Sequence, residues 1–514
     1  MNPIPLKWKT PLYPAIAILA GLVTAQVIAT FQVFFANQSL YHTLTAIGAR
    51  GYVTIPNDQT MGRLQELSAA LGGGLFLTLS VGAGISVLSL VAAWLWDRVG
   101  VGKTFLLVPL FLLWAGFSVG VNWNGFSLFT TLYCLLIPPA VFAGALALMP
   151  RGNRKQLRRN GLLHVIPIIV LGVLWAPQME KGLFINIRDY LLLSNPVGER
   201  VVDFYYQYTL YPAEILKPLD RKLLKTCSLN SIMEGPQKTE LHNTLLTHDW
   251  LETENKADVD LVLSLSGNTL ILENGGGITL EIPGNEFRFR PAAALKRFSS
   301  RSDRHRVFRQ FTFYSLLLGL PITLYILIYS LFLFLTRIWI TPRIADALSV
   351  MFCFSTGLML LIPFWQLNWH KVDHKDPGSA LESHNRYIRV NTLKDISKHH
   401  SDLSAFSAYK THLTSPYTAE RYWLAKGLGT SRNHGSHEIL LGFLKDPSPV
   451  VVSAALFSLG RRGEKKAIPK ILQCIKISDH WYVQWYAYRA LKTLGWKQKP
   501  FSADGSFQSR GLSP

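Results

Sequence analysis

Long apolar runs separated by short polar segments dominate the first 177 residues and return between residues 311 and 369. The runs cover residues 11–36, 68–96, 104–123, 126–149, 161–177, 311–336 and 347–369. A helix needs about 20 apolar residues to cross the hydrocarbon core, and the shorter run 161–177 suffices if it stands upright. The pattern therefore predicts a mainly α-helical, polytopic membrane protein of about seven spans. Residues 1–177 would form a bundle of five spans, and residues 311–369 would add two more.

The loop Pro150–Asn160 sets the predicted orientation, because it carries five cations and no acid between two apolar runs. Such loops stay on the cytoplasmic side of a membrane. This places the N-terminus in the cytoplasm and residues 178–310 and 370–514 outside it, in a plasma membrane of the bacterial inner type. The basic stretch 296–309 opposes this orientation, and if the run 161–177 were re-entrant, both soluble parts would lie in the cytoplasm.

The predicted spans contain several small residues and lack charged ones. Gly72–Gly74, Gly82 and Gly84 in the second span, and Gly116 with Gly120 in the third, are expected to form seams where helices pack closely. No Asp, Glu, Lys or Arg lies within the seven runs, and His164 lies one turn from the basic loop. Proton-coupled carriers need ionisable groups at mid-membrane, so this pattern argues against such a transporter.

Residues 178–310 are too long for a loop and predict a small α+β insert. The amphipathic stretch 182–194 is expected to lie along the membrane surface. Residues 199–225 predict a helix whose aromatic patch, 204–211, packs on the insert's own sheet or at headgroup level, with a ligand wall as the alternative. Alternating residues predict an antiparallel meander with strands at 259–265, 269–272, 278–282 and 287–290, and Gly275–Gly277 form a turn within it.

The C-terminal part repeats at intervals of about 30 residues. Asp446 begins a turn that leads into a helix ending in Leu459–Gly460, and Asp479 leads into another ending in Leu494–Gly495, with a looser copy ending at Gly429. A unit of helix, Asp-containing turn and helix ending in Leu-Gly predicts a two-helix solenoid over residues 415–496. Residues 370–414 would be a polar linker with capping helices, and residues 497–514 a disordered tail.

These motifs resemble HEAT repeats, in particular the short HEAT-like type named after phycobilisome lyases. The resemblance covers about 90 residues. It implies an α-solenoid that binds a protein partner, and it implies no catalytic residue and no chromophore chemistry.

No catalytic constellation, cofactor site or metal site is predicted. His370, His374 and His384 form the most metal-like cluster, but a solvated helix end explains them better than a metal does. The four cysteines follow no ligand or disulfide spacing. The sequence therefore leans against an enzyme.

The net charge of +20 divides unevenly along the chain. Residues 178–310 are neutral, with 17 basic and 17 acidic residues, whereas residues 369–514 hold 22 basic and 11 acidic ones. No groove-like stripe of Arg and aromatic residues indicates nucleic acid. The candidates for a partner surface are basic and aromatic residues of the repeats: Arg461, Arg462, Lys465, Lys466, Trp481 and Trp485. The sequence predicts an interaction or assembly protein in the lipid bilayer; the alternative is a membrane-embedded enzyme or carrier for a lipid or other apolar, uncharged substrate.

Overall fold

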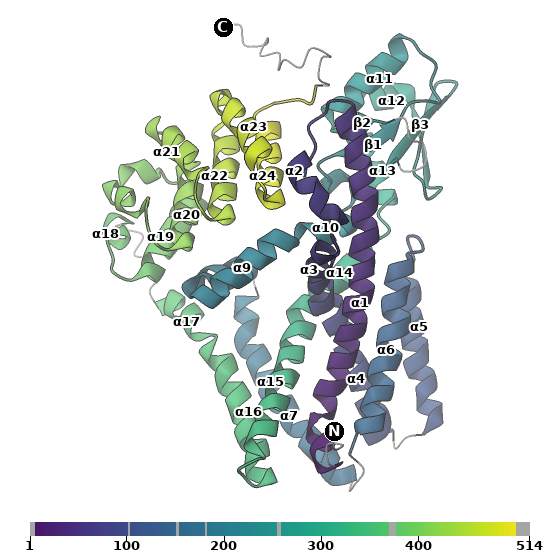
Figure 1. Ribbon diagram of the computed structural model, residues 1–514, viewed down its shortest axis with the longest axis vertical. Coiled ribbons are helices and arrows are strands. Elements are labelled where there is room, and N and C mark those ends of the chain that lie inside the picture. Colours follow the sequence, from purple (N-terminus) through teal and green to yellow (C-terminus); the bar gives the residue numbers. More distant parts are fainter. Residues whose placement is uncertain are drawn as a thin grey trace. The chain divides into compact units, whose positions relative to one another are not determined.

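The computed structural model describes residues 6–100, 103–150, 154–179, 182–253, 259–369 and 377–499. The chain divides into two compact units. The bundle unit contains residues 1–34, 70–184 and 303–365, and the solenoid unit contains residues 35–69, 185–302 and 366–514. Figure 1 shows that the fold is mainly helical, with one small sheet in the solenoid unit.

Long apolar helices make up the bundle unit, as the hydropathy pattern predicts. Six described helices are long and apolar enough to cross a membrane, and a seventh would count if the broken pair His164–Gln178 and Leu183–Ser194 were one span. The six are α1 (Leu6–Ala49), α3 (Leu67–Leu77) continuing into α4 (Ala83–Trp94), α5 (Leu107–Val121), α6 (Leu128–Leu148), α14 (Arg306–Tyr314) continuing into α15 (Leu320–Thr336), and α16 (Pro342–Met359) continuing into α17 (Ile362–Trp369). α7 (Arg154–Trp175) belongs to the broken pair. α1 extends 13 residues beyond the predicted end of the first span at residue 36.

Glycines of the second predicted span allow close approaches to two other helices, whereas those of the third predicted span do not. A Cβ atom on Gly319 would lie 2.7 Å from the Cα atom of Gly84, so α4 meets the start of α15 backbone to backbone. Gly82 makes a similar approach to Ala25 of α1. In contrast, a Cβ atom at Gly116 or Gly120 would meet nothing within 4 Å. The predicted seam in the second span is confirmed, and the one in the third span is wrong.

Polar side chains inside the bundle unit bond to neighbouring helices. The Gln26 amide donates to the Leu71 carbonyl at 3.0 Å and accepts from the Thr78 hydroxyl at 2.8 Å. The Tyr133 hydroxyl donates to Gln32 at 3.1 Å. Such bonds between helices stabilise packing where water is excluded.

The sheet of the solenoid unit has five strands in the order β2-β1-β3-β4-β5. β3 (Leu261–Ser266), β4 (Thr269–Glu273) and β5 (Thr279–Pro283) form the predicted antiparallel meander. β1 (Lys225–Ser228) and β2 (Trp250–Glu252) were not predicted; they pair in parallel around the crossover helix α11 (Pro236–Thr247). The fourth predicted strand, 287–290, is wrong, because Gly284–Phe289 is helix α12.

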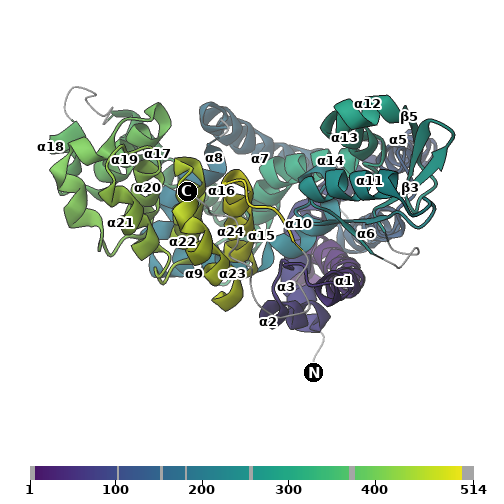
Figure 2. The same ribbon diagram turned by 90° about the horizontal axis from the view of Figure 1, so that it is seen from above.

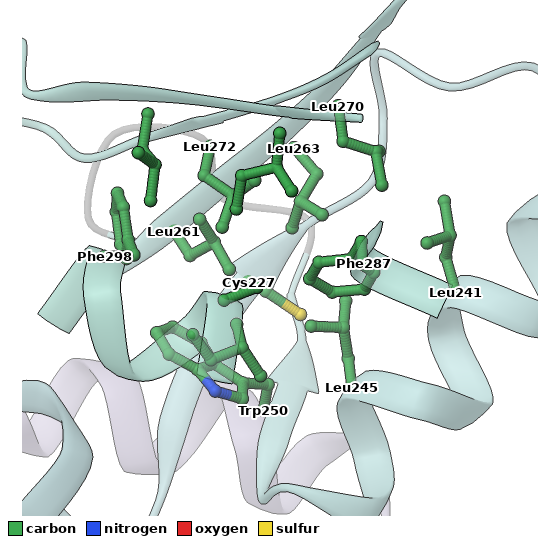
Figure 3. Close-up of a cluster of buried hydrophobic side chains, with 14 of the residues drawn as sticks. Cys227, Leu241, Leu245, Trp250, Leu261, Leu263, Leu270, Leu272, Phe287 and Phe298 are labelled. Atoms are coloured by element: carbon green, nitrogen blue, oxygen red, sulfur yellow. The ribbon is translucent and has the colours of Figure 1, made fainter. Parts of the chain in front are cut away.

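One apolar core holds this sheet and its helices together (Figure 3). Cys227 of β1 lies among leucines of β3 and β4, and Trp250 lies beside them. Phe287 of α12 and Phe298 of α13 (Pro291–Arg301) cover the sheet and are fully buried. Of residues 287–290, Phe287 enters this core, and it does so from a helix rather than from the predicted strand.

The solenoid stacks two rows of helices, which Figures 1 and 2 show from two sides. The inner row contains α19 (Arg386–His399), α20 (Thr418–Leu428), α22 (Pro449–Arg462) and α24 (Trp481–Thr493), each packed on the next. The outer row contains the shorter helices α18 (Pro377–Leu381), α21 (Gly435–Phe443) and α23 (Ile468–Ile477). α19 extends the inner row beyond the predicted repeats, in the region where capping helices were expected.

The Leu-Gly motif has a packing reason in this stack. A Cβ atom on Gly429 would lie 3.1 Å from the Cα atom of Ser458, and one on Gly460 would lie 3.0 Å from that of Ala490. Each glycine therefore lets the end of one inner helix approach the backbone of the next.

Candidate interaction surfaces of the solenoid

The inner row of the solenoid is covered by another part of the same chain. The stretch 186–211, which precedes the sheet, runs along α19, α20 and α24 and contacts each of them. Lys394 of α19 bonds the Asn186 side chain, and the Tyr190 hydroxyl bonds Asn391 of the same helix. We call residues 186–211 the covering segment.

A buried ion pair anchors the covering segment on α20. The Arg188 guanidinium lies 2.7 Å from the Asp189 carboxylate, and their side chains are 9% and 0% exposed. The Trp423 indole donates to the same carboxylate at 2.8 Å, and the Arg188 guanidinium lies 4.0 Å from the ring centre of Tyr422. Burial alone would lower the pKa of Arg188, but Asp189 and the neighbouring tyrosines raise it above its usual value.

The aromatic patch of the covering segment packs on α24. Tyr206 of α9 (Pro196–Tyr208) meets Tyr482 edge to face at 4.6 Å between ring centres. Tyr211 of α10 (Leu210–Leu216) meets Trp481 at 5.0 Å in the same manner. Two expectations change as a result: this patch packs on the solenoid rather than on the sheet, and the stretch 182–194 buries its charged pair against α20.

The loop after α1 also binds the solenoid. The Asn57 side chain donates to the carbonyls of Ile475 and Lys476 at 2.8 and 3.1 Å, and its backbone N–H donates to Gln484 at 2.8 Å. Gln498 is 1% exposed, and its amide bonds both the N–H and the C=O of Val53. Gln498 thus lies ordered within the predicted disordered tail, whose residues 500–514 lie outside the described part of the chain.

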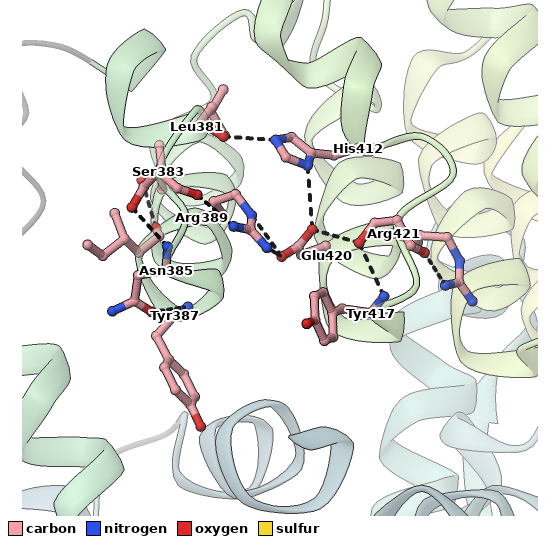
Figure 4. Close-up of polar contacts among 12 residues, drawn as sticks. Leu381, Ser383, Asn385, Tyr387, Arg389, His412, Tyr417, Glu420 and Arg421 are labelled. Carbon is pink, nitrogen blue, oxygen red and sulfur yellow. Dashed lines mark hydrogen bonds and ion pairs between the residues drawn. The ribbon is translucent and has the colours of Figure 1, made fainter. Parts of the chain in front are cut away.

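Charged side chains link successive helices of the solenoid, and Figure 4 shows the group around Glu420. The fully buried Glu420 carboxylate accepts from Arg389 at 2.6 Å and from the Ser415 hydroxyl at 2.7 Å. Arg421 pairs with Asp446 of the next turn at 2.7 Å. These groups are satisfied within the stack, so we interpret them as structural.

Three of the six residues predicted to bind a partner instead contact other residues of this chain. Trp481 is 5% exposed against Tyr211, and Trp485 lies between Lys217 and Arg489, at 5.3 and 4.7 Å from its ring centre. Arg462 bonds Glu464 and three backbone carbonyls, one at the end of α20 and two in the loop after it. The other three predicted residues are exposed: Arg461, Lys465 and Lys466.

Six of the eight exposed Lys and Arg residues within residues 415–496 lie in or beside the outer row. Its exposed basic residues are Arg432, Lys445, Lys465, Lys466, Lys470 and Lys476, against the exposed acids Glu438 and Asp479. Lys466 pairs with Glu464 at 3.1 Å, and Asp479 lies 3.8 Å from Arg63. We call these six basic residues the outer basic surface.

The predicted metal cluster is only partly described. His370 and His374 lie outside the described residues, and His384 lies in the bend between α18 and α19. Within the described ranges, no group of three His, Cys, Asp or Glu residues could hold a metal ion. All four cysteines are free and buried, and burial raises the pKa of Cys474 to about 11. Such thiols are poorly reactive.

A polar cleft of about 220 Å³ lies where the loop after α1, α10 and α24 meet. Arg63, Gln207, Tyr211 and His480 are among its lining residues. Ligand sites in proteins typically measure about 300–1,000 Å³. The cleft is smaller than this, and we assign no ligand to it.

The repeat pattern has a known counterpart. Residues 409–492 match the family model of HEAT repeats. No curated protein and no solved structure matches the chain. The C-terminal solenoid is therefore a HEAT-repeat module, of a class that serves protein interaction and scaffolding.

Proposed function

We propose that this protein is a membrane-anchored interaction protein whose solenoid binds an acidic protein partner through the outer basic surface. The observation that carries the proposal is that the two helix rows of the solenoid differ in what they contact. The covering segment contacts the inner row through a buried ion pair and aromatic rings, and the loop after α1 bonds the end of α23, whereas the side chains of the outer basic surface are exposed.

Charge supports the choice of partner. Four of the six residues of the outer basic surface lie between Lys465 and Lys476, in and beside one short helix. Complementary charge guides association and selects the partner. A protein with an acidic face fits this surface.

Contacts inside the solenoid unit support a seven-span topology. Asn57 follows the first predicted span, and it bonds Gln484 and Ile475, which follow the last. Arg50 likewise bonds the Glu252 carbonyl in the insert at 3.0 Å. Segments in contact must lie on one side of a membrane, and this favours a run 161–177 that crosses it. A re-entrant run would leave residue 57 on the opposite side from residues 252 and 484.

Cysteine labelling in intact cells tests this topology. Because the native cysteines are buried, single cysteines at the exposed positions Asp58, Lys296 and Lys470 can be labelled selectively with an impermeant maleimide. We expect all three to react and a cysteine at Lys103 to be protected. Labelling of the Asp58 position without the other two would refute the seven-span arrangement.

Photo-crosslinking tests the interaction role. A photoreactive residue at position 470 should capture one defined protein, and Lys465→Glu with Lys466→Glu should abolish the capture. Lys296→Glu, an exposed charge reversal on the insert, is the matched control and should leave it unchanged. Equal capture from positions 296 and 470, or capture that survives the double reversal, would contradict the proposal.

A further inference from the structure

A second cluster of positive charge lies on the inner row, where three successive helices meet. Lys426 comes from α20, Arg461 from α22 and Arg489 from α24. Arg461 and Arg489 are exposed, whereas Lys426 is partly buried, with its ammonium group 3.3 Å from the ring centre of Phe457. The cluster is separate from the outer basic surface.

Helix packing brings the cations of this cluster together. Lys426 lies on Phe457, and Arg461 follows one turn later on α22. Gly460 beside it meets the backbone of Ala490, next to Arg489. The charges that perturb Lys426 come from Arg461, Arg188 and Arg489, and all of them are positive. Asp189, the acid of the covering segment, is already engaged by Arg188 and Trp423. Like charges held together in a partly buried place favour an anion that neutralises them.

A half-exposed aromatic ring adjoins the cluster. Phe457 is 39% exposed beside Lys426, so an apolar surface borders the charge. Guanidinium groups bind phosphate through paired hydrogen bonds, and lysine adds a point charge.

We propose that Lys426, Arg461 and Arg489 form a binding site for a phosphate group, carried by a soluble phosphate compound or by a lipid headgroup. The two sources share the same chemistry at the site. They differ in whether acyl chains add affinity.

Burial and the three arginines also lower the pKa of Lys426 to about 8. The lysine therefore carries an electrostatic cost in the free protein at neutral pH. A bound anion would remove that cost, which is consistent with the geometry of the cluster.

Titration calorimetry on the full chain in a neutral detergent tests the site, with pyrophosphate, glycerol phosphate and dihexanoylphosphatidylglycerol as separate probes. We expect Lys426→Gln to weaken binding at least roughly tenfold, since it removes a hydrogen bond to a charged group. Arg489→Gln, at an exposed position, should weaken it similarly. The matched control is Lys445→Gln on the outer basic surface, which should leave the affinity unchanged.

The three probes distinguish the sources. Tighter binding of the short-chain lipid than of glycerol phosphate would identify a headgroup site, and tighter binding of pyrophosphate than of the lipid would identify a soluble compound. Failure of all three probes to bind, or equal binding by wild type and both variants, would overturn the proposal. Loss of partner capture through Lys465 and Lys466 would leave this result unaffected.

Discussion

Replacing Arg188 by methionine should loosen the covering segment from the solenoid. The substitution keeps the volume of the side chain but leaves the Asp189 carboxylate, which is 0% exposed, without its cation. Removing one partner of a buried ion pair costs about 3–5 kcal/mol. The Trp423 indole still donates to this carboxylate, so we expect a loss near the lower end, about 3 kcal/mol.

Hydrogen exchange of α20 measures this loss directly, because its amides open when the contact with the covering segment is lost. About 3 kcal/mol corresponds to roughly 100-fold faster exchange for amides that exchange by this opening. Exchange in α5 of the bundle unit should stay the same.

A matched double variant separates charge from contact. Arg188→Met with Asp189→Asn removes both charges and keeps an acceptor for Trp423, so most of the lost protection should return. If Arg188→Met left α20 exchange within about threefold of wild type, or if the single and double variants were equally affected, the reasoning from the buried charge would be refuted.

Three further perturbations test other parts of the structure. Lys426→Met should raise the stability of the solenoid unit by about 1–2 kcal/mol at pH 7, allowing for partial exposure. The folded pKa of Lys426, about 8, lies below the unfolded value, so wild-type stability rises with pH between about 8 and 10.5. The melting temperatures of wild type and variant should therefore converge over this pH range. Asn57→Ala should cost about 1–3 kcal/mol by removing the donor to the last carbonyls of α23, seen as faster exchange in α23; Asn57→Asp, which keeps the cap on Thr60, should not restore it. Gly319→Val should lower the melting temperature in detergent, because a Cβ atom there meets the Gly84 backbone at 2.7 Å, whereas Gly116→Val should not, since nothing lies within 4 Å.

Features that repeat locally along the chain were predictable from the amino-acid pattern. Apolar runs of span length predicted the long helices, alternation predicted the three-stranded meander, and the Leu-Gly spacing predicted the HEAT repeats. Each of these signals depends on residues that are close in the sequence, so it can be recognised before the fold is known.

The contacts between these elements, in contrast, become visible in the folded chain alone. The adjacent charges of Arg188 and Asp189 within an apolar stretch suggested a membrane surface, yet their buried pairing depends on Trp423 and Tyr422, more than 230 residues away in the sequence. The short strand β1 is buried along its whole length and shows no alternation, so only its parallel neighbours identify it. The cations around Lys426 are spread over three helices and the covering segment. Periodicity in the sequence does not reveal that these residues lie together, because long-range packing brings them there.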